Sequence, residues 1–439
     1  MFPFPKIRHS KALAMSDCKK DLPAFYGLPQ KVEYCSVCVL SNQRPASAIE
    51  FSHGQNTKKE TTTLDDQGVC DACRVHRIKH GEIDWEKRES ELRDLCARFR
   101  RNDGKYDCIV PGSGGKDSIY TSHLLKYKYN MHPLTVTYAP HIYTPWGWEN
   151  FQAWLHAGFD NYLFTVNGLV HRLITRIALE SLFHPFQPFI IGQKLFAPRI
   201  AAELGIPLVF WGEPEAEDGS PIANYGAAIQ DWSYFTSENR HSVVLGGVSV
   251  GELIENFGLT EKDLDPYLPA DPKTLRDAGI EVHYMGYYVR WHPQSSYYYA
   301  TENTGFKAAP ERTAGTYSKY VGIDDKIDDF HFYTYFIKFA LGRATYDAAQ
   351  ECRNNDITKD EAIDLVRRYD GEFPGRFMKE CFEYLSIPEN EYAVASKMFE
   401  QPIITREYFE MLTDHFRSPH LWKNTSNGWE LRFPIWKTT

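Results

Sequence analysis

The order of apolar and polar positions predicts strands that alternate with helices through the middle of the chain. The run Tyr106 to Val110 is short, apolar and ends at a turn signal, which is typical of a buried strand. Helical spacing of apolar residues follows it at once. The remaining segments of this kind are strands 134–138, 162–166 and 207–211 and helices 146–157, 168–181 and 194–203. Such alternation predicts an α/β fold with a doubly wound parallel sheet, in which ligands bind at the carboxyl ends of the strands.

The flanking segments show other patterns. Apolar residues at helical spacing among many charges predict a linker helix within 81–103, and helical periods from 323 onward, with Thr358 and Glu361 as a capping box, predict a helical C-terminal region. Segment 216–322 has weak periodicity and is expected to supply substrate loops. The expected organisation is a tail (1–33), a cysteine module (34–80), the linker helix (81–103), a nucleotide-binding domain (104–215), the loops (216–322) and the helical region (323–439).

A glycine-rich turn joins the first predicted strand to its helix. A strand, a tight turn and a helix N-terminus aim several backbone N–H groups at one anion, and glycines allow close approach. Walker A requires Ser or Thr after Lys116, and the dinucleotide fingerprint requires a third glycine where Asp117 stands. The remaining reading, SGGKDS over 113–118, resembles the pyrophosphatase loop of enzymes that release pyrophosphate from ATP. A tight turn without a ligand is the alternative.

The residues of this loop are predicted to have separate roles in binding ATP. The turn would bind the β- and γ-phosphates, Asp117 would hold Mg²⁺, and Lys116 would stabilise the leaving pyrophosphate. Lys194 is a third catalytic candidate, and backbone atoms at the end of strand 134–138 could read the adenine edge. Ordinary loop chemistry is the alternative for the positions outside the turn. The candidate nucleotide contacts are Pro111, Gly112, Ser113, Gly114, Gly115, Lys116, Asp117, Ser118, Thr137, Tyr138, Gly192 and Gln193.

Two C-x-x-C pairs precede the sheet. Cys35 and Cys38 form one pair and Cys70 and Cys73 the other, a pattern typical of a tetrahedral Zn²⁺ site. Four thiolates leave no open coordination position, so we expect a structural role, with four unmetallated thiols as the alternative. The chain has 9 cysteines, an odd number, and the others are isolated. This usage indicates reduced thiols and a cytoplasmic location.

Composition narrows the class of protein. The 439 residues are 43% hydrophobic and 15% aromatic, which favours a globular protein of several domains. The net charge of −9 disfavours an extended nucleic-acid footprint. No apolar run approaches the ~20 residues of a membrane helix, and the N-terminus has no hydrophobic signal region. We therefore expect neither a nucleic-acid partner nor a membrane span.

The motifs together resemble the N-acetyl sugar amidotransferases of bacterial surface-polysaccharide and nonulosonic-acid pathways. The resemblance runs from about Tyr34 to Phe382. The segments that carry it are 34–38, 68–74, 113–118, 158–161, 185–190, 192–194, 315–320, 324–328, 342–347 and 368–374.

The resemblance implies a reaction and its partners. ATP would adenylate the amide oxygen of a nucleotide-activated N-acetyl sugar, and ammonia would displace AMP to give an acetamidino group, in lipopolysaccharide O-antigen or related glycan synthesis. Ammonia must be kept from water, which favours a channel from a separate glutaminase. That glutaminase would be similar to the one of histidine biosynthesis, with its barrel-shaped synthase partner. Candidate sugar contacts are Glu213, Tyr317, Lys319, Asp324, Asp325 and Lys326.

The main alternative is a tRNA-thiolating enzyme with the same loop. Such enzymes commonly carry extra cysteines near the loop, whereas Cys352 and Cys381 follow it here without forming a C-x-x-C pair. A nucleotide sensor without catalysis is the third possibility, and Lys116 with Asp117 argues against it, since binding alone needs no metal carboxylate.

Overall fold

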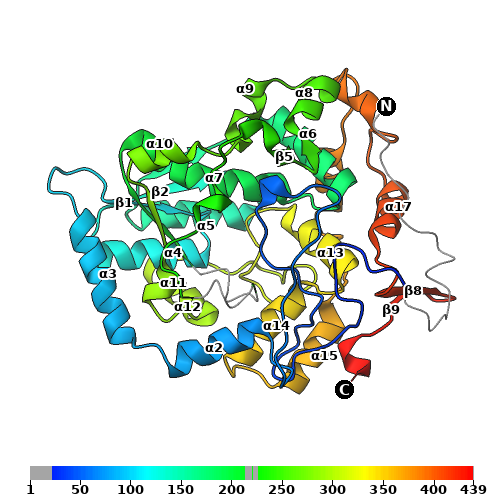
Figure 1. The fold of residues 1–439 in the computed structure, drawn as a ribbon, viewed down its shortest axis with the longest axis horizontal. Coiled ribbons are helices and arrows are strands. Elements are labelled where there is room, and N and C mark those ends of the chain that lie inside the picture. The colour runs from blue at the N-terminus through cyan, green and yellow to red at the C-terminus, as the bar shows by residue number, and fades with distance from the viewer. Residues whose placement is uncertain (1–21, 213–219, 221–225, 439) are drawn as a thin grey trace.

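A five-stranded parallel sheet forms the centre of the protein (Figure 1). The computed structural model describes residues 22–212, 220 and 226–438, so the candidate Glu213 lies outside the described residues. The strand order is β3-β2-β1-β4-β7, and each neighbouring pair is parallel. This confirms the predicted α/β fold. The strands are β1 (Cys108–Pro111), β2 (Pro133–Tyr138), β3 (Asn161–Phe164), β4 (Leu208–Trp211) and β7 (Glu281–Tyr284).

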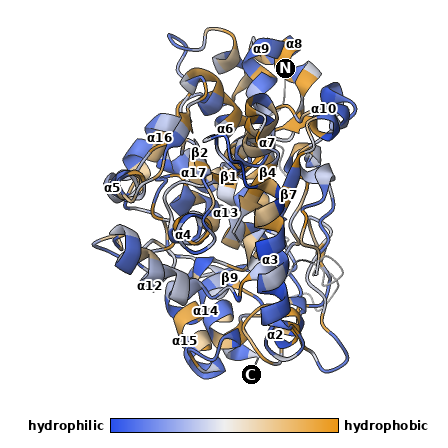
Figure 2. Ribbon diagram, turned by 90° about the vertical axis from the view of Figure 1, so that its left-hand side faces the viewer, coloured by the Kyte–Doolittle hydropathy of each residue, from blue (hydrophilic) through white to orange (hydrophobic). Residues whose placement is uncertain are grey.

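The inner strands are apolar because both faces of the sheet are covered. Cys108 and Val110 face one core, with Leu124 after α4, whereas Ile109 between them faces the other, with residues of α6 and α7. This alternation follows from the two-residue period of a strand, and burial on both faces explains the continuous apolar run. Figure 2 shows β1, β2 and β4 in the middle of the molecule, with the hydrophilic helix α3 outside them.

Helices predicted around the sheet are present with small shifts. The Asp84 carboxylate accepts a hydrogen bond from the Lys87 amide, which fixes the start of α3. The Thr144 hydroxyl does the same for α5, and a short π-helical segment, 124–128, continues α4. These helices are α3 (Trp85–Phe99), α4 (Lys116–His123), α5 (Pro145–His156) and α6 (Gly168–Leu182).

Helix α7 (Gln187–Leu204) begins earlier than expected, which corrects the placement of Gly192, Gln193 and Lys194. All three lie inside this helix, whereas the sequence predicted the helix only from residue 194. Pro188 occupies the first turn of α7, where proline is tolerated, so it does not end the helix. Gly192 is a packing residue, since a Cβ there would stand 2.1 Å from Cζ of Tyr138.

The segment expected to form loops is largely regular where it is described. Strand β7 pairs with β4, so the sheet extends past residue 215. The helices here are mostly four to eight residues long, too short for a clear period in the sequence. The elements are β5 (Val244–Leu245), β6 (Val248–Ser249), α8 (Val250–Phe257), α9 (Glu261–Leu264), α10 (Pro272–Asp277), α11 (Met285–Tyr288) and α12 (Pro293–Thr304).

The C-terminal region is helical, as predicted, and ends in a two-stranded antiparallel hairpin that the sequence did not reveal. Thr358 and Glu361 form the predicted capping box. In Figure 1 this region lies beside the N-terminal module, with α14 and α15 next to α2 (Asp71–Gly81). The elements are α13 (Asp328–Phe339), α14 (Arg343–Arg353), α15 (Lys359–Tyr369), α16 (Met378–Leu385), α17 (Arg406–Phe416), β8 (Trp422–Thr425) and β9 (Gly428–Leu431).

Candidate functional site

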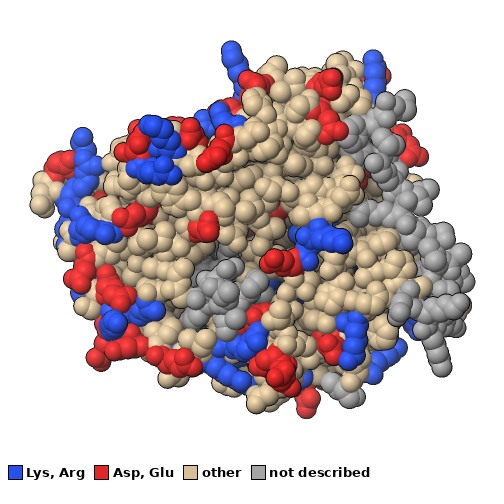
Figure 3. Space-filling model, viewed as in Figure 1, with Lys and Arg blue, Asp and Glu red and all other residues tan. Residues whose placement is uncertain are grey.

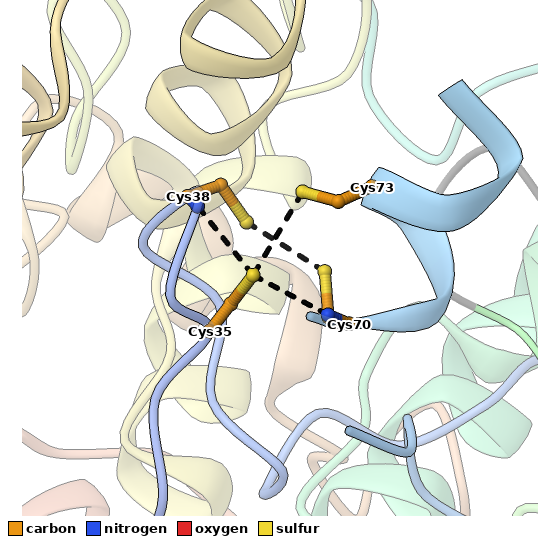
Figure 4. Close-up of side chains that lie close together, drawn as sticks. All are labelled: Cys35, Cys38, Cys70 and Cys73. Atoms are coloured by element: carbon orange, nitrogen blue, oxygen red, sulfur yellow. Dashed lines mark hydrogen bonds between the residues drawn. The ribbon is translucent and has the colours of Figure 1, made fainter. Parts of the chain in front are cut away.

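The four cysteines of the N-terminal module converge on one point (Figure 4). Cys35 and Cys38 lie on a loop, and Cys70 and Cys73 lie at the start of α2. Sγ of Cys35 is 3.8 Å from Sγ of Cys73, and Sγ of Cys38 is 3.7 Å from Sγ of Cys70. Sulfurs at ~2.3 Å from a tetrahedral zinc stand about 3.8 Å apart. The buried cluster therefore has the dimensions of a structural zinc site.

Backbone donors add to the cluster. The amides of Val37 and Cys70 each lie 3.3 Å from Sγ of Cys35, and the amide of Cys38 lies 3.5 Å from it. Hydrogen bonds from the other cysteines, Cys38 first, lower the pKa of the Cys35 thiol. Donors around a sulfur favour its thiolate form, which is the form that binds a metal.

The predicted phosphate loop joins β1 to α4 at the carboxyl edge of the sheet. Gly112 and Gly114 are both required by its geometry. A Cβ on Gly112 would stand 2.1 Å from Cβ of Ser118, and Gly114 has a φ of +85° with Phe151 packed against it. The first turn of a helix leaves N–H groups without partners inside the helix, and its dipole favours negative charge. The loop and the start of α4 can therefore receive an anion such as a phosphate.

Lys116 and Asp117 place opposite charges at this turn. Nζ of Lys116 lies 2.6 Å from Oδ1 and 2.7 Å from Oδ2 of Asp117. The Lys116 side chain is nearly buried, whereas that of Asp117 is 35% exposed. The lysine suits a phosphate oxygen and the more exposed carboxylate suits a divalent cation.

Two cavities meet at the loop. The smaller, about 300 Å³, lies between the loop, α7 and the ends of β4 and β7. The larger, about 570 Å³, lies between the loop and the C-terminal helices α13 and α14. Ser113, Gly115, Asp117 and Gln193 line both. The turn thus forms the boundary between two spaces, which suits a reaction that joins two substrates. The smaller cavity is lined by Pro111, Gly112, Ser113, Gly115, Asp117, Ser118, Gln193, Lys194, Trp211, Gly212, Gln230 and Tyr284.

Three of the predicted nucleotide contacts do not line either cavity. Thr137 is buried, and its hydroxyl accepts a hydrogen bond of 3.0 Å from Nδ2 of Asn161. Tyr138 is buried against Gly192 and Phe189, and its burial raises the pKa of the phenol. The side chains at the carboxyl end of β2 therefore pack in the core. Gln193 and Lys194 line the smaller cavity from within α7.

Of the predicted sugar contacts in the described residues, Asp324 is the one that lines a cavity. It faces the larger cavity and its carboxylate is hydrogen-bonded to the side chain of Ser113 in the loop. Burial raises the pKa of Asp324, and this hydrogen bond lowers it. The C-terminal region and the phosphate loop are therefore joined at this carboxylate.

The other candidates make structural contacts. Oδ2 of Asp325 accepts a hydrogen bond of 2.7 Å from the His141 amide, and Nζ of Lys326 lies 3.3 Å from Oε1 of Glu380. Tyr317 donates to Oε2 of Glu351 over 2.8 Å, and Nζ of the exposed Lys319 donates to the Pro310 carbonyl. These contacts fix the four side chains within the fold, and their contact with a sugar stays a prediction.

Helix α14 supplies a wall that the sequence analysis did not identify. Its polar residues at positions i, i+3, i+4, i+7, i+8 and i+11 line the larger cavity, and the opposite face packs on the cysteine module through Ala348, Ala349 and Cys352. The signal was present as helical spacing, but only the fold shows which face meets a cavity. The residues on the cavity side are Arg343, Tyr346, Asp347, Gln350, Glu351 and Asn354.

The wall carries aromatic and charged groups together. The Arg343 guanidinium lies over the ring of Phe332, 4.4 Å from its centroid, and Nε lies 3.2 Å from Oδ1 of Asp347. Tyr346 donates to the hydroxyl of Tyr335 over 2.7 Å. Rings beside carboxylates and a guanidinium suit a ligand that has both apolar faces and hydroxyl groups.

Comparison with known proteins finds similarity to a protein family and to a curated relative. Residues 314–434 match the sequence model of a family described as LPS biosynthesis protein WbpG-like, C-terminal domain. A curated relative, the uncharacterized protein MJ1599 of Methanocaldococcus jannaschii, is 31% identical over 102 residues. That match covers 23% of this chain and 31% of the relative, so it spans less than a third of the relative's length. Among the described residues, no helix is long and apolar enough to cross a membrane. Over α13 to α17, of which α13 and α14 line the larger cavity, the chain is similar to WbpG-like proteins of LPS biosynthesis.

Proposed function

We propose that the chain is an ATP-dependent amidotransferase of lipopolysaccharide biosynthesis, which converts a sugar N-acetyl group to an acetamidino group and releases AMP and pyrophosphate. The observation that carries the proposal is the position of the SGGKDS turn between two cavities. The larger one is walled by the region that is similar to WbpG-like proteins. The finer chemistry follows from the resemblance to N-acetyl sugar amidotransferases.

On the nucleotide side, the turn holds the β- and γ-phosphates and the smaller cavity takes the adenosine. Lys116 stabilises the charge that develops on the leaving pyrophosphate, and Lys194 lines the smaller cavity from α7. The Asp117 carboxylate would hold Mg²⁺, which as a Lewis acid supplies further charge stabilisation on the phosphates. The α-phosphorus is left open to attack from the larger cavity.

On the acceptor side, the larger cavity binds a nucleotide-activated N-acetyl sugar. The amide oxygen attacks the α-phosphorus and pyrophosphate leaves, so an unreactive carbonyl gains a good leaving group. Ammonia then attacks the carbon of the activated amide, and AMP departs. Carboxylates and amides of α14 suit sugar hydroxyls, and the Phe332 and Tyr335 rings suit the sugar faces.

Ammonia would come from a separate glutaminase similar to that of histidine biosynthesis, together with its barrel-shaped synthase partner. The cysteines among the described residues are all buried, which does not suit a glutaminase nucleophile within this part of the chain. A closed route would keep ammonia from water.

A tRNA-thiolating activity is less well supported. Cys352 and Cys381 are buried and line neither cavity at the loop. On the face in Figure 3, basic and acidic side chains are interspersed and do not form a continuous basic stripe. An RNA footprint depends on such a stripe.

The test is incubation of the purified chain with ATP, Mg²⁺, ammonium and a panel of UDP- and CMP-linked N-acetylated sugars. Mass spectrometry should show the exchange of O for NH at one acetamido group, with equal amounts of AMP and pyrophosphate. Release of ADP, or AMP release that no sugar stimulates, would contradict the proposal. The variant Asp117→Ala provides the inactive control.

A further inference from the structure

Two adjacent carboxylates in the first turn of α13 have different surroundings. Both oxygens of Asp329 lie 3.1 Å from the Arg376 guanidinium. Asp328 is equally well buried, at 7% exposed, and it lines the larger cavity. None of the hydrogen bonds or ion pairs formed by the described residues involves its carboxylate, whose oxygens keep some exposure in that cavity. Buried carboxylates are normally paired or hydrogen-bonded, so this group has the properties of one kept for a ligand.

Burial, together with the neighbouring carboxylates, raises the proton affinity of the Asp328 carboxylate above that of an ordinary aspartate. Burial raises the pKa of Asp328 well above its usual value, and the nearby Arg343 charge lowers it in part. Asp324, Asp329 and Asp325 add negative charge and raise it further. Perturbed carboxyls of this kind are concentrated at reactive sites.

The position of Asp328 relates it to the reacting atoms. Asp324 lies just before α13 in the chain and is hydrogen-bonded to Ser113 of the phosphate loop. Asp328 and the loop residues Lys116 and Asp117 line the same cavity. Oδ2 of Asp328 would stand 2.3 Å from a Cβ on Gly322, which lines the same cavity, so the backbone approaches this carboxylate closely because residue 322 has no side chain.

We propose that Asp328 accepts the proton that attacking ammonia releases and then pairs with the cationic amidinium product. This inference rests on the proposed function. The nitrogen lone pair forms the new C–N bond, and an N–H proton passes to the Asp328 carboxylate. The C–O bond to AMP breaks, with its electron pair leaving on the AMP phosphate. Return of the proton to the departing AMP phosphate regenerates the carboxylate, which pairs with the amidinium N–H groups as carboxylates do with guanidinium.

The test compares two nucleophiles in the variant Asp328→Asn, which keeps the shape and loses the proton acceptor. Ammonia is strongly basic, so its adduct needs a base; hydroxylamine is much less basic, and its adduct loses the proton to water. We expect turnover with ammonium to fall about 10²-fold or more. Turnover with hydroxylamine and sugar-dependent pyrophosphate release should stay within a few-fold of wild type. Asp329→Asn is the matched control and should leave the ratio of the two nucleophiles unchanged.

The outcomes separate this inference from the proposed function. A wild-type chain that gives no sugar-dependent AMP refutes both. If the wild type is active and Asp328→Asn keeps its turnover with ammonium, only the role of Asp328 is refuted. The same holds if this variant loses turnover with both nucleophiles equally. If Asp328→Asn does not fold, Asp328→Ser is measured in the same way, because a smaller side chain fits the same space without the proton acceptor. Its selective loss of ammonium turnover supports the proposal and an equal loss refutes it.

Discussion

Substitution of Gly114 by alanine tests whether the phosphate loop depends on close contact with α5. Gly114 has a φ of +85°, in the left-handed region. A Cβ at this position would stand 2.7 Å from Cα and 3.0 Å from N of Phe151 and 3.2 Å from the Asn150 carbonyl oxygen. These are backbone atoms of a helix, so no side-chain rotation relieves the contact.

The expected loss of stability in Gly114→Ala is the sum of two contributions, one from the close contact and one from the backbone conformation. Non-bonded carbons are comfortable at about 3.5 Å or more, so the loop and α5 must separate by roughly 0.8 Å. Overpacking of this kind costs about 1–3 kcal/mol. The left-handed conformation costs an alanine roughly 1–2 kcal/mol more. We therefore expect Gly114→Ala to lower the free energy of unfolding by about 2–5 kcal/mol.

The assay is urea unfolding together with ATP titration. Gly104→Ala is the matched control, since Gly104 has a φ of +75° and nothing lies within 4 Å of its Cβ position. It should lose only the backbone term, about 1–2 kcal/mol, and bind ATP as wild type does. A loop displaced by this amount should bind ATP up to roughly 10²-fold more weakly. Equal destabilisation in the two variants, or full ATP affinity in Gly114→Ala, would refute the reasoning.

Three further predictions concern other parts of the molecule. Metal analysis should find about one zinc per chain. Cys70→Ser should lose the zinc and lower the urea midpoint of unfolding, whereas Cys96→Ser, at an isolated buried cysteine, should keep the zinc. Equal zinc contents in the two variants would show that the four-cysteine cluster does not bind the metal. Asp117→Asn should lower turnover at least ~10²-fold. It should change the free energy of unfolding little, because the Asp117 side chain is 35% exposed. Full activity of this variant would exclude the role of Asp117 in metal binding. Burial raises the pKa of Asp370 to about 6, so the folded protein binds this proton more tightly than the unfolded chain. The stabilisation is largely present at pH 4 and is lost as the pH rises through 6. Relative to Asp370→Asn, the free energy of unfolding of the wild type should fall by about 2 kcal/mol between pH 4 and 7, and an opposite trend in urea unfolding would contradict it.

The sheet and its first helices were predictable because local signals agreed with the fold. β1 and β2 are buried along their whole length, so they read as continuous apolar runs. Asp84 marks the start of α3 with a capping hydrogen bond. The four-cysteine cluster was predictable from spacing alone, because each C-x-x-C pair supplies two neighbouring sulfurs.

The cavity walls were not predictable, because they depend on contacts between distant segments. Gly192 reads as a loop residue, yet it packs against Tyr138 inside α7. Strand β7 has only four residues and joins the sheet through β4, from which it is separated by about seventy residues of sequence. Asp328 reads as an ordinary acidic helix start, and its burial without a hydrogen-bond partner depends on the packing around it.

Helix α14 connects the two halves of the candidate site. Its apolar side contacts the cysteine module, where Sγ of Cys352 donates to the Val37 carbonyl over 3.4 Å. From the neighbouring α15, Nζ of Lys359 donates to the Cys35 carbonyl over 2.8 Å. Its polar side lines the larger cavity with Arg343 and Glu351. A metal in the four-cysteine cluster would therefore fix the wall that receives the acceptor, whereas the phosphate loop is held by β1 and α5. Loss of that metal should then weaken acceptor binding before it affects ATP binding, because of the two cavities at the loop the helix that it supports lines only the larger.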